Sequence, residues 1–164
     1  MGKKEEKERP DIMDAAVRYI SVCMRSEGEV IKHLKKKGYP EEEIFPAVQQ
    51  MKDLNYLDDE EFCRVAMEKS MKKGHGINRI RSEMQQKWGI AADIIDRVAE
   101  DICISETERQ RAMKMAEKVL LGKEPDEKMK ARIGRRLSYY GYSTDTVYWV
   151  LNNLNMLRQE DTYE

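Results

Sequence analysis

Apolar side chains recur along this chain with the period of an α-helix, in runs separated by short polar segments. One run places four apolar residues at positions i, i+3, i+4 and i+7, which form one helical face: Ile44, Ala47, Val48 and Met51. Residues 13–24 carry a similar stripe, and a helix opening near residue 59 is expected to turn Phe62, Val65 and Ala66 inward. Long alternating runs of Val, Ile and Thr, typical of strands, are missing from the sequence. The pattern predicts an all-α protein.

Helix start and stop signals separate these runs. Ser26 followed by Glu29, and Ser105 followed by Glu108, have the spacing of a capping box, in which a hydroxyl and a carboxylate close the first turn. Acidic residues 41–43 and 58–61 suit helix N-termini because the helix dipole is positive there. With glycines as terminators, the signals predict nine helices.

A pattern of about fifty residues repeats along the chain. Gly38, Gly89 and Gly141 end helices 51 and 52 residues apart, and each precedes an apolar residue. Apolar residues recur in all three copies at six, nine, ten and thirteen residues after the glycine. Helicity alone explains the spacing of those four positions, but it does not explain the shared glycine and its apolar neighbour. The sequence predicts an internal triplication.

The predicted organisation is three tandem three-helix repeats stacked into an elongated, curved molecule. Stacking is expected because a unit of about 50 residues is close to the lower limit for a self-sufficient core. We expect bending at the junctions between repeats. The predicted divisions are a mobile tail, repeat 1, repeat 2, repeat 3 and a second tail, at residues 1–12, 13–57, 58–104, 105–157 and 158–164.

Charge alternates within each repeat, although the formal net charge is only −1. Residues 62–89 hold seven Lys or Arg and two Asp or Glu, whereas residues 90–110 hold two and six. The first two helices of every repeat are therefore basic and the third is acidic. The helix dipole accounts for part of this pattern. It does not account for Arg79 and Arg81 near a helix start, nor for the density of cations between Lys123 and Arg136.

If equivalent helices share one side of the array, their cations form a stripe that could follow a phosphate backbone or an acidic protein groove. The alternative is that these residues are ordinary solvated helix faces. The candidate contacts are Arg79, Arg81, Arg132, Arg135 and Arg136, supported by Lys35, Lys36, Lys72 and Lys73.

Catalytic and metal chemistry find little support. The two histidines, His33 and His75, are interpreted as a surface residue and a turn residue, and no nucleophile–base set, metal-ligand cluster or nucleotide loop is visible. Cys23, Cys63 and Cys103 each fall in an apolar stripe and are expected to be buried free thiols. We predict a non-enzyme without cofactor or metal.

Membrane and secretion signals are also missing from the sequence. No stretch approaches the ~18 consecutive apolar residues of a membrane span, and the charged N-terminus lacks the apolar core of a signal peptide. We expect a cytoplasmic monomer that does not enter the membrane.

Several segments, taken in order, resemble the RecX family of recombination regulators. Residues 25–30 lead to a basic run and Gly38-Tyr39, residues 56–63 match a tyrosine-leucine-acidic-acidic start, and residues 73–80 match a glycine-x-glycine turn followed by a basic residue. The likeness covers residues 15–155. Ile77 stands where the family pattern suggests proline, and Trp88 is an insertion before Gly89.

The resemblance implies a regulator of homologous recombination and DNA repair. Such a protein binds the RecA recombinase filament on single-stranded DNA and inhibits filament extension, strand exchange and ATPase activity. Direct contact with single-stranded DNA is expected to be weak or made through the filament. Two alternatives remain open at this stage: a helix-turn-helix DNA-binding protein, and a helical-repeat adaptor for other proteins.

Overall fold

The computed structural model describes residues 9–103 and 108–155, and within these ranges the chain forms nine α-helices and no strand. The predicted all-α class is confirmed. The helices are α1 (Ile12–Ile20), α2 (Glu27–Lys36), α3 (Glu41–Asp53), α4 (Asp59–Lys72), α5 (Ile77–Trp88), α6 (Ala92–Cys103), α7 (Glu108–Leu120), α8 (Glu127–Tyr139) and α9 (Thr144–Asn153).

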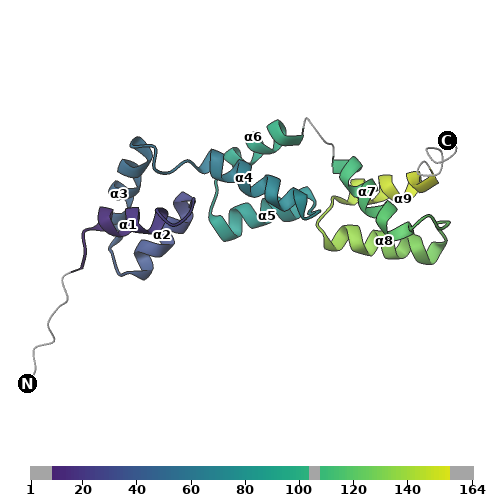
Figure 1. The fold of residues 1–164 in the computed structure, drawn as a ribbon, viewed down its shortest axis with the longest axis horizontal. Coiled ribbons are helices and arrows are strands. Elements are labelled where there is room, and N and C mark those ends of the chain that lie inside the picture. The colour runs from purple at the N-terminus through teal and green to yellow at the C-terminus, as the bar shows by residue number, and fades with distance from the viewer. Residues whose placement is uncertain (1–8, 104–107, 156–164) are drawn as a thin grey trace, which may run out of the picture.

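The helices pack in threes, and each group encloses its own core. One cluster of buried apolar residues belongs to α1–α3 and the residues that follow them, a second to α4–α6 and a third to α7–α9. Figure 1 shows the three groups in a row along the longest axis, which makes the molecule elongated. The tandem arrangement of three-helix units follows directly from these separate cores.

The glycines used to align the repeats occupy equivalent structural positions. Gly38, Gly89 and Gly141 all have positive φ values, of 86°, 68° and 83°, as expected for residues that end helices in the left-handed region. The apolar residue after each glycine is buried in the core of its own unit: Tyr39, Ile90 and Tyr142. The periodicity therefore identified the internal repeat correctly.

Several predicted helix caps are present as hydrogen bonds. Ser26 and Glu29 form a full capping box at the start of α2, and the Asp58 carboxylate accepts the backbone N–H of Glu61 at the start of α4. Ser143 caps α9 in the same way through Thr146. The capping box predicted at Ser105 lies outside the described residues.

The prediction for the first helix was wrong at its C-terminal end. The helix stops at Ile20, and residues 21–26 form a connection to the Ser26 cap. Cys23 and Met24 are therefore exposed rather than buried. The apolar spacing continued past the helix end, so periodicity alone placed the boundary too late. Cys63 is buried as predicted, whereas the side chain of Cys103 lies outside the described residues.

The inward face of α4 was also assigned incorrectly. Val65 is 47% exposed, while Cys63 and Met67 are buried on the opposite phase of the helix. Phe62 is buried as predicted, and Ala66 is partly buried. Because positions 62, 63, 65, 66 and 67 are all apolar, two different faces of this helix could point inward. Packing against α6, which supplies Ile95 and Val98 to the same core, selects the one containing Met67.

The second helices of successive units meet end to end. At the first junction, the hydroxyl of Ser26, the N-cap of α2, donates to the carbonyl oxygen of Trp88, the last residue of α5, at 2.7 Å. At the second junction, the N–H of Gly76, the N-cap of α5, donates to the carbonyl oxygen of Tyr140, directly after α8, at 2.8 Å. At both junctions the N-terminus of one helix meets the C-terminus of the next unit's helix, so α2, α5 and α8 form a continuous row (Figure 1).

A carboxylate from the following unit contacts each of these helix N-termini. Asp59 accepts the backbone N–H of Glu27, the first residue of α2, at 2.7 Å. Glu108 accepts the backbone N–H of Ile77, the first residue of α5, at 3.1 Å. A negative charge at a helix N-terminus is stabilised by the free N–H groups there. Burial raises the pKa of Asp59, so this carboxylate sits where desolvation opposes its charge.

Glycine is required at both junctions because backbone meets backbone. A β-carbon added to Gly28 would lie 2.4 Å from the carbonyl oxygen of Trp88. A β-carbon at Gly76 would lie 2.4 Å from the backbone nitrogen of Tyr142. Neither position has room for a larger residue unless the two units move apart.

The limits predicted for tails and repeats remain predictions. α1 already begins at Ile12, inside the segment expected to be a tail. The junction expected near residues 103–108 falls mostly outside the described residues. Within residues 9–103 and 108–155, no helix combines the length and apolar character needed to span a membrane.

Candidate anion-binding groove

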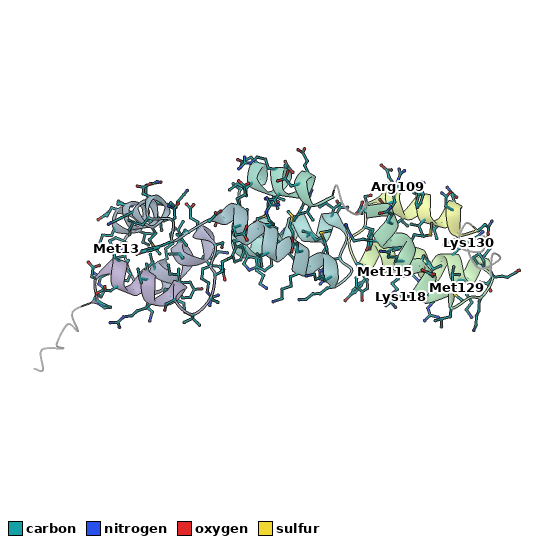
Figure 2. The ribbon with its side chains drawn as sticks, turned by 45° about the horizontal axis from the view of Figure 1, so that its top comes forward. Met13, Arg109, Met115, Lys118, Met129 and Lys130 are labelled. Atoms are coloured by element: carbon teal, nitrogen blue, oxygen red, sulfur yellow. The ribbon has the colours of Figure 1, made fainter. Side chains whose placement is uncertain are left out.

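A groove of about 360 Å³ lies between the second and third units, where the end of α4 faces α7 and α8. Its lining includes apolar and aromatic side chains, among them Met71, Met115 and Tyr140. Figure 2 labels Met115 and Lys118 on α7, and Met115 lies on the side of the third unit that faces the second. Contact between units supports this placement, because a β-carbon on Gly74 would lie 2.9 Å from the Met115 methyl carbon.

Positively charged side chains surround this groove. The six cations that line it are Lys72, Lys73, Arg111, Lys114, Lys118 and Arg136. No Asp or Glu from the described part of the chain lines it. Like charges held together by a folded scaffold raise the local potential, and an anion that enters relieves the repulsion. We refer to these six residues as the cationic groove.

Three elements supply the cations, each by a different local rule. Lys72 and Lys73 stand at the C-terminal end of α4, where the helix dipole favours positive charge. Arg111, Lys114 and Lys118 are spaced by three and four residues, which places them on one face of α7. The guanidinium of Arg136 on α8 lies over the Tyr140 ring, 5.6 Å from its centroid, a contact that orients the charge.

The structure separates the cations singled out from the sequence. Lys72, Lys73 and Arg136 line the cationic groove. Arg132 and Arg135 are exposed on α8 and do not line it. The signal that identifies Arg111, Lys114 and Lys118 is their helical spacing, which a charge count over whole segments does not detect.

The remaining candidates stand apart from the groove, and most of them form ion pairs. Arg79 Nε lies 3.2 Å from Glu83, and Arg81 pairs with Asp96 across the second unit. Lys35 pairs with Glu41 at 2.5 Å, and Lys36 is exposed in the last turn of α2, in the first unit. The role of every candidate in binding remains a prediction.

The two histidines occupy structural positions. His75 lies in the turn between Gly74 and Gly76, as predicted, with Nδ1 2.8 Å from the Ser70 hydroxyl. Burial lowers the pKa of His75, and the charge of Arg79 lowers it further, so the ring is neutral at neutral pH. His33 was predicted to be a surface residue, but it is partly buried and stacked on Tyr19, with ring centroids 3.9 Å apart.

Within the described ranges, no group of three or more His, Cys, Asp or Glu side chains is arranged to hold a metal ion. The acidic residues 41–43 and 58–61 lie at the N-termini of α3 and α4, as predicted. The architecture defines a helical-repeat protein with three tandem units.

Comparison with known proteins identifies the family. A family model described as "RecX, first three-helix domain" matches residues 13–51. The regulatory protein RecX of Vibrio campbellii is 36% identical over 143 residues, which cover 85% of this chain and 88% of that protein. The regulatory protein RecX of Vibrio parahaemolyticus is 33% identical over 140 residues, again covering 85% and 88%. This chain belongs to the RecX family of regulatory proteins, which is not a family of enzymes.

The solved structures agree on the fold. The crystal structure of RecX from Lactobacillus salivarius superposes with a TM-score of 0.77 at 20% identity, covering 88% of this chain and 95% of that one. A second crystal structure of a regulatory protein RecX gives a TM-score of 0.71 at 22% identity, covering 86% and 70%. At these identities, the likeness establishes the shared architecture.

Proposed function

We propose that this protein binds the RecA recombinase filament on single-stranded DNA and inhibits filament extension, strand exchange and ATP hydrolysis. The observation that carries the proposal is sequence likeness to RecX regulatory proteins over 85% of the chain. The likeness to RecX proteins indicates RecA as the partner, and the cationic groove offers a surface for the contact.

The shape of the molecule suits a filament better than a single globular partner. Three units in a row can contact neighbouring protomers of a helical assembly at the same time. Each contact after the first is intramolecular, so modest affinities at each unit combine into tight binding. An array seated along the filament obstructs the addition of subunits and the domain movements that accompany ATP turnover. The regulator itself performs no chemistry.

The charges favour a negatively charged contact on the filament. The cationic groove can pair with phosphates of the DNA strand or with acidic side chains of the recombinase. Ion-paired residues such as Arg79 and Arg81 would have to give up an existing partner before binding another. The cationic groove is the stronger candidate for the contact, because it gathers six cations and no Asp or Glu of the described chain lines it.

The direct test adds purified protein to RecA on single-stranded DNA and follows ATP hydrolysis and strand exchange. We expect inhibition that increases with the ratio of protein to RecA. Unchanged hydrolysis at several-fold excess over RecA contradicts the proposal. A parallel measurement without RecA addresses the helix-turn-helix alternative, because that reading requires discrimination between DNA sequences by the protein alone.

Charge reversal then tests the surface. The variant Lys72→Glu/Lys118→Glu should raise the concentration for half-inhibition by about tenfold or more, since each lost charged contact is worth on the order of 1.5–3 kcal/mol. The matched control, Lys123→Glu/Lys128→Glu, changes the net charge equally at exposed positions outside the groove. Equal effects from both variants would show a dependence on net charge and exclude the groove as the contact. Arg132→Glu/Arg135→Glu tests the other predicted cations of α8 in the same way.

A further inference from the structure

A second cationic pocket lies at the opposite end of the array, in the first unit. It has a volume of about 420 Å³ and is formed by residues around α1, the connection after it, and the end of α2. Half of its ten lining residues are basic: Arg9, Arg18, Arg25, His33 and Lys37. No acidic residue of the described chain lines it.

The carboxylates of Asp11 and Glu29 already have partners. Asp11 accepts the backbone N–H groups of Met13 and Asp14 and so caps α1. Glu29 contacts Arg25 through one guanidinium nitrogen, Nη1, at 3.1 Å. Arg18 and Lys37 form no ion pair within the part of the chain that the structure describes. The positive charge of the pocket is therefore only partly compensated by the protein.

One donor in the wall has no partner. The Nε atom of Arg25 is buried, and no hydrogen-bond acceptor lies within reach of it in the described structure. A buried N–H of a charged group without an acceptor is costly, so the protein satisfies the Arg25 guanidinium only in part. The Arg25 guanidinium is held in place over the Tyr19 ring, 4.5 Å from its centroid, so its donors are fixed before any ligand arrives.

The aromatic side chains of the pocket serve as supports. His33 and Arg25 already contact the Tyr19 ring, and the Tyr39 hydroxyl donates to the Pro10 carbonyl oxygen at 2.6 Å. A planar base therefore finds no open aromatic face on Tyr19. The chemistry on offer is a ring of cationic donors around an open volume, which suits a compact polyanion with several acceptor oxygens.

We propose that this pocket binds a phosphate group, supplied either by a nucleic-acid strand or by a free nucleotide. Guanidinium groups match the geometry of phosphate oxygens, and the positively charged site requires no metal to attract them. None of the six cations of the cationic groove belongs to this pocket, so it forms a separate contact at the other end of the row.

His33 provides a built-in probe of occupancy. Burial lowers the pKa of His33, and the charges of Lys37, Arg25 and Lys36 lower it further. A phosphate dianion beside these cations opposes their effect and raises the pKa of His33. The chain contains two histidines, and His75 lies in the second unit. The ring signals of His75 therefore serve as an internal reference in the same proton NMR spectrum.

The experiment titrates the full-length protein, without recombinase, with inorganic phosphate, adenosine monophosphate, and thymidine oligonucleotides with or without a 5′-phosphate. We expect saturable shifts of the His33 signals, a raised pKa of His33, and no comparable change at His75. Response to phosphate or the mononucleotide identifies a free phosphate group as sufficient. Response to oligonucleotides alone identifies the strand backbone as the source. Absence of a His33 response to all four probes overturns the proposal.

Two variants assign the effect to the pocket. Arg18→Gln/Lys37→Gln removes two exposed cations and should weaken binding about tenfold or more, since charge-assisted contacts are lost. Lys123→Gln/Lys128→Gln, in the third unit, should bind like the parent protein. Equal weakening in both variants overturns the proposal. Since recombinase is absent, the result is independent of whether the protein inhibits RecA.

Discussion

Replacement of Gly28 by alanine separates two opposing effects on one residue. Gly28 lies within α2, and alanine in a helix is favoured over glycine by about 1 kcal/mol. By propensity alone, the substitution should stabilise the protein. At this position, however, the added methyl group would lie 2.4 Å from the Trp88 carbonyl oxygen and 3.1 Å from the Gly89 α-carbon. Both of these contacts are backbone atoms of the next unit, so no side-chain rotation relieves the overlap.

The magnitude follows from the bonds at that junction. A carbon and a carbonyl oxygen approach to roughly 3.3 Å, so the two units must separate by about 1 Å. The 2.7 Å bonds from Ser26 to Trp88 and from Glu27 to Asp59 would then exceed hydrogen-bonding distance. Their loss costs about 2–4 kcal/mol together, since one acceptor is a carboxylate. After the gain in helix propensity, we expect a net destabilisation of about 1–3 kcal/mol.

Gly134→Ala is the matched control. Gly134 also lies inside a helix, but its added methyl group would meet Leu151 at 3.5 Å, an ordinary van der Waals contact. We expect Gly134→Ala to stabilise the protein by about 0.5–1 kcal/mol. Urea denaturation followed by circular dichroism measures both variants, and amide hydrogen exchange at Glu27 reports on the junction. If Gly28→Ala raises stability as Gly134→Ala does, the close backbone approach between units does not exist.

Three further predictions concern single side chains. Ser26→Ala should destabilise the protein by about 1–2 kcal/mol in urea denaturation, since it removes both the helix cap and the bond to the next unit. Burial raises the pKa of Asp59 above its ordinary 3.8. Ionisation of this carboxyl therefore lowers the stability of the folded protein as pH rises through the folded pKa. Asp59→Asn should flatten that decline, which is measured as the urea midpoint at a series of pH values. A pH dependence as steep as the parent's would contradict this. In a Cys103→Ser background, a thiol reagent at neutral pH should label the exposed Cys23 rapidly. It should label the buried Cys63, whose pKa is raised to about 11, only after unfolding. Fast labelling of two thiols would refute the assignment.

Local helix signals and the internal repeat could both be predicted from the sequence. The shared glycines with their apolar followers gave the three-unit fold because helix termination and helix periodicity are encoded within short segments. The same reasoning failed at Cys23, because the apolar spacing continues beyond the end of the helix. It also failed at Val65, because two faces of that helix are equally apolar. At Val65, packing of α4 against α6 decided which face is buried.

The candidate sites depend on contacts between segments far apart in the sequence. Lys72 and Lys118 line one groove only because the second and third units dock through Gly76 and Tyr140. The close backbone approaches at Gly28 and Gly76 could not be predicted either, since a sequence does not reveal which backbone lies against a glycine. The charge count along the chain located basic helices, but it could not show which of their cations surround a groove.

The end-to-end junction also limits the length of the array. The contact has two different faces, so each unit that offers a helix N-terminus requires another that offers a helix C-terminus, and such a scheme could in principle continue without end. In the third unit, the corresponding N-terminus begins with Asp126, Glu127 and Lys128 and contains no glycine, so it lacks the residue that lets backbone meet backbone at the two internal junctions. At the other end, the Arg9 guanidinium already occupies the carbonyl oxygen of Gly38. We therefore expect that further copies of the chain do not extend the row through this contact.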